Sequence, residues 1–525
     1  VLTRVVEDDG VDVTGVPSPA LDTTYEYEGG YFDRGEKEFF GFRTVTVHRQ
    51  DGATIERQYV NDDYALKGRL RSETLRDVSG AVFTRVVNDH DVRAEHTAAP
   101  AEPCVVTRHP LLPSTACDSV FPFVRQVTTE SCEGGVVPTD CKSRTERDLA
   151  HDAFGNLVES VDFGDETTSD DDVHARATYT DDASRWIVGL PRTLEATDAA
   201  AARLRLREAV YSAEGNLESL SVQTGTGTAT TAMQYDAFGN VKHVTLPRGE
   251  TGPAQDYTYA YDETAHQYVI HITDGFGYSS SADYDFKWGL PTTTTDLNGQ
   301  AMTRAYDGFG RLASVRGPYD GADPAVSIEY DLRAACPSWI HAARCPTALT
   351  ANRSSPPASH TGPVPATIKT ATIVDGFGRP VVVTKSSEVR GVEGFTSTGP
   401  VGYDALGRAI VRAHPFFTAT GAEPPPADLP RTTFSHDVLD RVRTTKYPDD
   451  TSESVAYSIA PSPDGIRMFR TEVTDPNGHL RETFNDTLGR TVAVVEHPDA
   501  SSSAVTRYAY RPTGELRRIE DAAGN

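Results

Sequence analysis

Carboxylate pairs are the first residues in this sequence that could do chemistry. A glycoside hydrolase needs two carboxylates on either side of one bond, and neighbouring aspartates occur at Asp62/Asp63 and Asp449/Asp450. Residues 170–172 are three aspartates, whose oxygens could hold a hard cation such as calcium. Because this triplet lacks the following glycine and the distal glutamate of a calcium loop, we interpret it as an exposed acidic loop. Acidic doublets are usually solvated, so we do not predict glycosidase activity.

The other residue types that commonly carry catalysis form no signature. The sequence contains no H-E-x-x-H, no G-x-S-x-G and no G-x-x-x-x-G-K-[S/T] motif. The histidines are scattered, and His151 and His436 occupy an aromatic position of the repeat described below, where packing explains them better. We therefore predict no catalytic, cofactor-binding or metal-binding residues, no cofactor, and a protein that is not an enzyme.

Tryptophans and cysteines leave alternatives open. Trp186, Trp288 and Trp339 could stack on sugars, but for the first two we favour packing in the core beside Gly-Leu-Pro turns. None of the six cysteines forms a C-x-x-C pair, which argues against a zinc or redox motif. Cys132/Cys141 and Cys336/Cys345 share a spacing of nine residues, and either a disulfide in each loop or free thiols would fit.

Composition restricts the class of protein. Lys and Arg number 50 against 76 Asp and Glu, and the resulting formal charge of −26 repels phosphate backbones and anionic lipids. We therefore predict no nucleic-acid partner, and we read the acidity as a solvated surface or as solubility for an exported protein. No apolar run approaches the length of about 18 residues that a membrane helix needs. The start, Val1 to Arg4, is no signal peptide and lacks Met, so we expect an internal piece of a longer chain.

The strongest pattern is an internal repeat, aromatic-Asp-x-Φ-Gly-[Asn/Arg], in which Φ is Phe or Leu. Aspartate followed three residues later by glycine is typical of a type I turn, and the aspartate can cap that turn through downstream backbone N–H groups. Glycine tolerates the positive φ of a G1 bulge, which lets the turn reverse a hairpin. Copies begin at His151, Tyr235, Tyr306, Val374, Tyr403 and Asn485, with degenerate copies at Tyr211, His436 and Tyr510.

A second kind of turn lies one strand upstream of the first. Turns beginning at Asp274, Asp296 and Asp475 each precede the next turn aspartate by 11 residues. Turn, strand of about seven residues and turn form a β-meander, so the sequence predicts a long antiparallel array. Residues 521–525 form another such turn, and its partner would lie past Asn525, so we expect the array to be cut in mid-repeat.

These residues resemble the RHS/YD-repeat family. Within it, residues 31–42, which read Tyr-Phe-Asp-Arg-Gly-Glu-Lys-Glu-Phe-Phe-Gly-Phe, and residues 65–70, Ala-Leu-Lys-Gly-Arg-Leu, are similar to the B component of insecticidal Tc toxin complexes and to related SpvB-type virulence proteins. The resemblance implies an all-β fold in which a long array of antiparallel hairpins forms a curved or spiralling sheet, a shell segment, with Pro-rich inserted loops. It divides the chain into a Tc-B-like start (1–97), a Cys/Pro-rich insert (98–145) and the repeat array (146–525), with inserts near 336–367 and 418–430.

The resemblance also implies a function. We expect a structural shell segment of a large secreted bacterial toxin that encapsulates a toxic C-terminal polypeptide. Its partners would be that cargo polypeptide, other RHS shell segments of the same or a partner chain, and a pore-forming component that binds regions absent from this sequence. The alternative is a cell-surface YD-repeat protein that binds carbohydrate or mediates contact.

Overall fold

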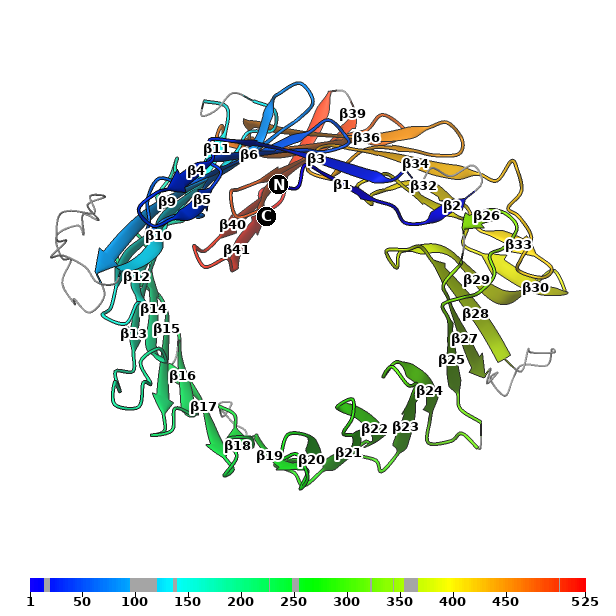
Figure 1. Ribbon diagram of the computed structural model, residues 1–525, viewed down its shortest axis with the longest axis horizontal. Helices are drawn as coiled ribbons and strands as arrows, with labels where there is room; N and C mark the ends of the chain where they lie inside the picture. Colours follow the sequence, from blue (N-terminus) through cyan, green and yellow to red (C-terminus); the bar gives the residue numbers. More distant parts are fainter. Residues whose placement is uncertain are drawn as a thin grey trace. The chain divides into compact units, whose positions relative to one another are not determined.

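The computed structural model describes residues 1–13, 19–94, 120–135, 139–225, 227–247, 255–321, 323–342, 344–353, 367–499 and 501–525. All 41 regular elements in these ranges are β-strands (Figure 1), which confirms the all-β prediction. The described residues contain no helix that is long and apolar enough to cross a membrane.

Most strands belong to one antiparallel sheet of 27 strands, in which neighbours along the chain pair with each other. The pairing order is β1 (Arg4–Glu7), β3 (Leu21–Glu28), β6 (Thr44–His48), β7 (Thr54–Tyr59), β8 (Leu70–Arg76), β9 (Val82–Ala94), β10 (Val120–Ser131), β11 (Lys142–His151), β12 (Leu157–Asp162), β13 (Val173–Tyr179), β14 (Pro191–Thr197), β15 (Arg203–Tyr211), β16 (Leu217–Thr224), β17 (Gly227–Tyr235), β18 (Val241–Thr245), β19 (Asp256–Tyr261), β20 (Val269–Asp274), β21 (Ser279–Asp285), β22 (Leu290–Thr295), β23 (Ala301–Tyr306), β24 (Leu312–Arg316), β25 (Val326–Asp331), β27 (Thr347–Arg353), β28 (Thr367–Val374), β29 (Pro380–Val389), β30 (Val392–Ser397) and β33 (Phe416–Thr418).

A second antiparallel sheet holds ten strands from the C-terminal part of the chain. Its order is β31 (Val401–Tyr403), β32 (Ala409–Ala413), β34 (Arg431–His436), β35 (Val442–Lys446), β36 (Ser452–Pro461), β37 (Arg467–Thr474), β38 (Leu480–Asn485), β39 (Thr491–Asp499), β40 (Ser502–Tyr510) and β41 (Leu516–Glu520). Two small sheets pair β2 (Val11–Val13) with β26 (Ile340–Ala342), and β4 (Tyr31–Asp33) with β5 (Glu38–Gly41). The predicted meander is therefore the organising pattern of both large sheets.

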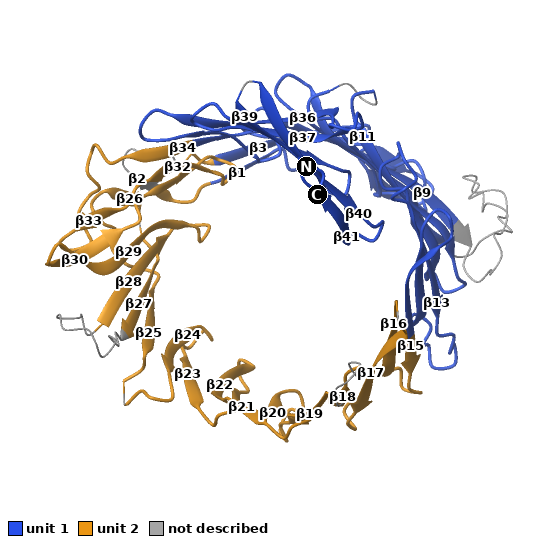
Figure 2. Ribbon diagram, turned by 180° about the vertical axis from the view of Figure 1, so that it is seen from behind, with its two compact units in different colours: residues 1–7, 21–208, 434–525 blue, residues 8–20, 209–433 orange. Residues whose placement is uncertain are grey.

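The described residues divide into two compact units (Figure 2). Unit 1 contains residues 1–7, 21–208 and 434–525, and unit 2 contains residues 8–20 and 209–433. Unit 1 therefore brings together segments that lie hundreds of residues apart, and unit 2 does the same for residues 8–20 and the region around 340–380.

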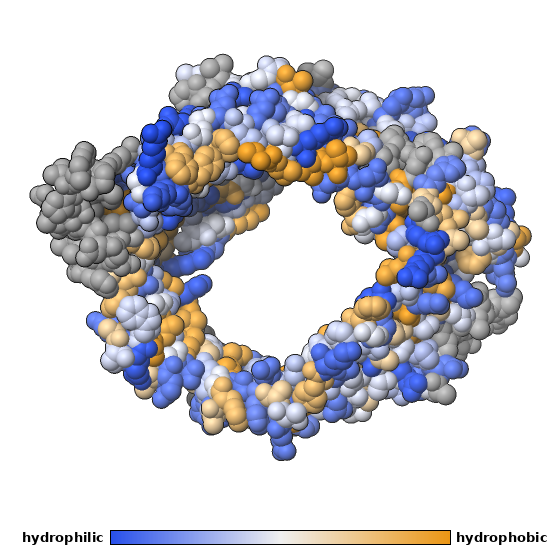
Figure 3. Space-filling model, viewed as in Figure 1, coloured by the Kyte–Doolittle hydropathy of each residue, from blue (hydrophilic) through white to orange (hydrophobic). Residues whose placement is uncertain are grey.

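Buried side chains form small local clusters. The largest contains Trp339, Ile340, Cys345 and Val382 in unit 2, and another in unit 1 contains Phe484 and Ala493. On the face drawn in Figure 3, hydrophobic residues appear as patches among hydrophilic ones. Local clusters are typical of repeat arrays, in which each repeat packs mainly against its neighbours.

Two expectations from the sequence are corrected by the structure. The predicted insert 98–145 contains β10, which pairs with β9 and β11, so residues 120–131 belong to the sheet. Trp186 is 70% exposed and Trp288 36%, so packing in the core is the wrong interpretation for both. Each lies in a turn, and Trp186 has a positive φ of 58°. Trp339 is buried.

Candidate functional site: arginine turns that join distant parts of the chain

Every copy of the aspartate turn closes as predicted. In the turn 375–379, the Gly378 N–H donates to the Asp375 carbonyl at 3.0 Å. The Asp375 Oδ1 accepts the N–H groups of Phe377 and Arg379, both at 2.9 Å. The same turn hydrogen bond joins the glycine or its equivalent to the first turn residue at 152–155, 212–215, 236–239, 307–310, 404–407, 437–440, 486–489 and 511–514. The second kind of turn, at 274–277, 296–299, 475–478 and 521–524, closes in the same way.

The arginine that ends the repeat unit folds back onto the same aspartate. Arg379 Nε donates to Asp375 Oδ2 at 2.6 Å, so one carboxylate oxygen caps the backbone while the other holds the guanidinium. The matching bonds of Arg311, Arg408, Arg441 and Arg490 measure 2.7, 2.6, 2.8 and 2.6 Å. Charge-assisted bonds of this kind fix the plane of the guanidinium. In Arg311 and Arg441 the Nη2 also lies 2.7 Å from the same aspartate oxygen.

A tyrosine from a later strand covers this arginine. The Arg379 guanidinium carbon lies 4.2 Å from the centre of the Tyr403 ring, and the Tyr403 hydroxyl donates to the Pro380 carbonyl at 3.1 Å. Arg441 and Tyr457 repeat the arrangement, with 3.8 Å to the ring centre and 3.2 Å to the Val442 carbonyl. The tyrosine therefore contacts the turn that came before it. The sequence showed the tyrosine and the arginine as parts of the repeat but gave no sign of this contact.

Two turn arginines use their remaining nitrogens to bind carboxylates far away in the sequence. In unit 1, Arg441 binds Glu133 with two parallel bonds, Nη1 to Oε1 at 2.9 Å and Nη2 to Oε2 at 2.6 Å. In unit 2, Arg379 Nη2 donates to Asp9 Oδ2 at 2.9 Å, and the Gly376 N–H donates to the Asp9 carbonyl at 2.7 Å. The turn unit thus has two roles, closing its own hairpin and holding a distant segment.

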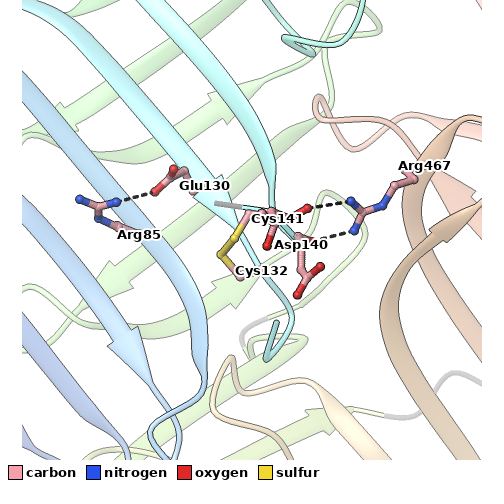
Figure 4. Close-up of a disulfide and its surroundings, with 7 residues drawn as sticks. Arg85, Glu130, Cys132, Asp140, Cys141 and Arg467 are labelled. Carbon is pink, nitrogen blue, oxygen red and sulfur yellow. Dashed lines mark hydrogen bonds and ion pairs between the residues drawn. A yellow bond between two sulfur atoms is a disulfide. The ribbon is translucent and has the colours of Figure 1, made fainter. Parts of the chain in front are cut away.

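Three further contacts in unit 1 join its N-terminal and C-terminal segments. Arg49 donates to the Val438 carbonyl at 3.0 Å, and Arg205 pairs with Glu515. Arg467 donates to the carbonyls of Thr139 and Asp140, both at 3.0 Å (Figure 4). We call these three contacts, together with Arg441–Glu133, the seam of unit 1. All four join a strand or turn of the 27-stranded sheet to a strand or turn of the ten-stranded sheet.

Electrostatics follow from these contacts. Burial acts to lower the pKa of Arg441, but hydrogen bonds to Glu133 and Asp437 outweigh it and raise the pKa above its ordinary value. Hydrogen bonds from the Thr513 hydroxyl and from Arg205 hold the pKa of the Glu515 carboxyl at about 2. The charged forms are therefore the ones that the seam stabilises.

The fold and the N-terminal region match those of known toxins. Residues 2–73 match the family described as "Insecticide toxin TcdB middle/N-terminal region". The crystal structure of TcdB2-TccC3 is similar to this chain with a TM-score of 0.72 at 13% identity, over 96% of this chain and 34% of that one. The predicted resemblance to a Tc-toxin B component is confirmed.

Two other solved Tc toxin structures give the same result. TcdB2-TccC3-Cdc42 matches with a TM-score of 0.72 at 13% identity, over 97% of this chain and 36% of that one. A Photorhabdus luminescens Tc holotoxin pore matches with 0.72 at 12% identity, over 96% and 36%. This chain therefore spans about a third of the solved Tc toxin chains. No curated protein sequence matched it.

The neighbouring aspartates that the sequence analysis considered as catalytic or metal-binding residues accept hydrogen bonds from nearby backbone N–H groups. Asp63 accepts the N–H groups of Ala65 and Leu66, and Asp449 accepts from Thr451. Asp171 Oδ2 accepts the Asp165 N–H. In the described ranges, no three His, Cys, Asp or Glu side chains are grouped as a metal site would require. The absence of catalytic and metal-binding residues stays a prediction.

Both cysteine pairs with nine-residue spacing form disulfides, Cys132–Cys141 and Cys336–Cys345. The sequence left free thiols equally open. Cys104 and Cys117 lie outside the described residues. The first disulfide closes the loop that carries Glu133, Thr139 and Asp140, all of which belong to the seam.

Proposed function

We propose that this chain is a shell segment of a large secreted bacterial toxin of the Tc type, and that the shell encloses a toxic C-terminal polypeptide. The observation that carries the proposal is the seam. A wall built from a single meander would have free hairpin ends, and the seam joins the 27-stranded sheet to the ten-stranded sheet through four arginine contacts, of which Arg441–Glu133 is bidentate and mostly buried. Breaking this mostly buried pair would cost more than breaking an exposed pair such as Arg205–Glu515, whose side chains are 49% and 47% exposed.

The likeness to TcdB2-TccC3 supports the same proposal. By that analogy the partners are the toxic polypeptide, further RHS shell segments and a pore-forming toxin component, which would bind through regions beyond this sequence. The proposed role is structural, without enzymatic activity. The proposed organisation is a Tc-B-like start (1–97), a Cys/Pro-rich segment (98–145) that contributes β10 to the sheet, and the repeat array (146–525).

The test is protection of the cargo. The full-length parent protein is produced with its toxic polypeptide, and the rate at which an added protease cleaves that polypeptide is compared with the rate for the polypeptide alone. We expect strong protection in the complex, weakened by Arg441→Ala at the seam and unaffected by Arg311→Ala in a turn away from it. Equal cleavage rates with and without the parent protein would refute encapsulation. Specific binding on a glycan array, with no protection, would instead favour a carbohydrate-binding role.

A further inference from the structure

A hollow with a volume of about 650 Å³ lies on one face of β7, β8 and β9 in unit 1. Residues 79–81 of a hairpin turn and residues 134 and 135 also line it. Apart from Val82, the strand residues that line it are polar or charged: Glu56, Gln58, Ser72, Thr74, Arg76 and Arg85. Ligand pockets are usually lined mainly by apolar side chains, so a ligand that fits this hollow must itself be polar.

The strand register orders the charges across the hollow. Glu56 of β7 lies opposite Thr74 of β8, and Thr74 lies opposite Arg85 of β9. Residues that pair directly across antiparallel strands share a face of the sheet and have Cβ atoms about 5 Å apart. Arg76, two residues beyond Thr74 on the same strand, lines the same hollow. A ligand therefore meets a carboxylate at the β7 side, a hydroxyl in the middle and a guanidinium at the β9 side.

Two hydroxyl groups in the hollow have no protein partner. Ser72 and Thr74 are only 8% and 6% exposed, and neither side chain makes a hydrogen bond with a residue that the structure describes. Hydroxyl groups in this position can donate to or accept from a polar group that enters the hollow. Gln58, opposite Ser72, donates from Nε2 to Glu56 Oε1 at 2.8 Å. The second carboxylate oxygen of Glu56 can accept a hydrogen bond from a ligand.

The two arginines of the hollow are only partly used by the protein. Arg76 Nη1 donates to the carbonyl of Gly80 in the adjoining turn at 3.4 Å, and no carboxylate in the described ranges forms an ion pair with Arg76. Arg85 Nη1 donates to Glu130 Oε2 at 3.2 Å (Figure 4). A guanidinium has five N–H donors, so both arginines can bind a further carboxylate. The sequence analysis did not single out any of these residues, because the hollow forms only when three strands pair.

We propose that this hollow binds a sugar acid, a hexose that carries a carboxylate group. The carboxylate binds Arg76 and Arg85, because a guanidinium matches a carboxylate in charge and in hydrogen-bond geometry. The sugar hydroxyls bind Ser72, Thr74 and Glu56, which offer both donors and acceptors. The negative charge of Glu56 keeps the ligand carboxylate at the arginine side and so fixes the orientation of the ring. This inference goes beyond the shell function and stands whether or not the shell encloses a cargo.

The experiment measures ligand binding to the full-length parent protein by saturation-transfer NMR of the ligand. The probes are glucuronate and galacturonate, the neutral sugars glucose and galactose, and acetate, which carries the carboxylate without the ring. We expect at least one of the two sugar acids to bind about tenfold more tightly than its neutral sugar and than acetate, since hydrogen bonds to charged groups contribute that much. Affinity for acetate equal to that for the sugar acids would overturn the proposal, and so would equal affinity for the neutral sugars. No saturation transfer to either sugar acid would overturn it as well, while the cargo-protection assay would be unaffected.

Two substitutions on β8 form a matched pair. Arg76→Gln removes the guanidinium inside the hollow, whereas Arg71→Gln removes an exposed one that alternation places on the other face of the same strand. We expect Arg76→Gln to weaken sugar-acid binding by about tenfold and to leave neutral-sugar binding unchanged, and Arg71→Gln to change neither.

A third substitution tests the hydroxyl groups. Thr74→Val replaces a hydroxyl by a methyl group of similar size and should weaken the binding of both kinds of sugar by about two- to tenfold. Equal losses of sugar-acid binding in Arg76→Gln and Arg71→Gln would reveal a general effect of surface charge and overturn the proposal. If Arg76→Gln fails to fold, the comparison of the ligands on the unmodified protein decides alone.

Discussion

Two turns of unit 2 have the same five-residue sequence but different surroundings. Residues 307–311 read Asp-Gly-Phe-Gly-Arg, and so do residues 375–379. In both, the arginine binds its own aspartate and lies 5.2 Å from the phenylalanine ring and 4.2 Å from a following tyrosine. Yet the Asp307 side chain is 24% exposed, whereas that of Asp375 is 1% exposed, because Asp9 packs against the second turn.

This comparison separates what the repeat does alone from what it does with a partner. The arginine is oriented by its own aspartate and tyrosine in either case, so the guanidinium is held in position before any distant partner binds it. A distant carboxylate then binds an arginine that is already ordered. This preorganisation lowers the entropy cost of forming the contact. The turn 437–441 in unit 1 extends the series, because Glu133 binds Arg441 with both carboxylate oxygens.

The largest effect is expected from removing the bidentate arginine. Arg441→Ala leaves the mostly buried carboxylates of Glu133 and Asp437 without their cation, and we expect the local opening free energy of the turn to fall by about 2–3 kcal/mol. Arg311→Ala removes a partly exposed pair within a single turn, with an expected loss of about 0.5–1 kcal/mol. Amide hydrogen exchange of residues 437–441 and 307–311 measures both. Equal losses at the two turns would show that the distant carboxylate adds nothing.

Substituting alanine for the glycine at the second position of each turn, Gly376 or Gly308, tests whether a distant segment packs against that turn. A Cβ on Gly376 would lie 2.4 Å from the Asp9 carbonyl oxygen, whereas one on Gly308 meets no atom within 4 Å. Neither glycine has a positive φ, so alanine suits the backbone of both. We expect Gly376→Ala to cost about 1–3 kcal/mol, since backbone must move, and Gly308→Ala to be neutral or to stabilise by about 0.4–1 kcal/mol. Hydrogen exchange of β2 and the turn 375–379 provides the measurement, and a neutral Gly376→Ala would mean that Asp9 does not contact this turn in solution.

The local part of this arrangement was predictable, and the distant part was not. The aspartates and glycines of the repeat predict each turn, because a turn is determined by four or five consecutive residues. Nothing in a single sequence connects Arg441 to Glu133 or Arg379 to Asp9, since 308 and 370 residues separate them. The arginine that ends several of the repeat units is a signal for a further role, but the sequence does not show which residue it binds.

The two wrong predictions, for residues 120–131 and for Trp186, have the same cause as the missed distant contacts. The stretch 120–131 was assigned to an insert because its flanks are rich in cysteine and proline, yet β10 forms there because β9 and β11 offer partners on both sides. The neighbouring Gly-Leu-Pro predicts Trp186 in the core, but the residue lies in a turn and is 70% exposed. Tertiary context outweighed local composition in both cases.

The smallest effect, and the most specific one, concerns protonation at the seam. The Glu515 carboxyl has a pKa of about 2, owing first to the Thr513 hydroxyl and then to Arg205, and Asp499 also has a pKa of about 2, owing to Ser501 in its own turn. A carboxyl whose folded pKa is depressed stabilises the fold above its ordinary pKa, and this contribution is lost as the pH falls from about 4.5 towards 2. Arg205→Ala should therefore raise the pKa of Glu515 only part of the way to its ordinary value, because the larger cause, Thr513, remains, and it should leave Asp499 unchanged. Carboxyl ¹³C shifts of labelled Glu and Asp give both values. If the pKa of Glu515 does not change in Arg205→Ala, the contact between Arg205 and Glu515 does not form in solution. If only the pKa of Glu515 rises, the carboxylate is stabilised both by Thr513 in its own turn and by Arg205, which lies 310 residues away in the sequence.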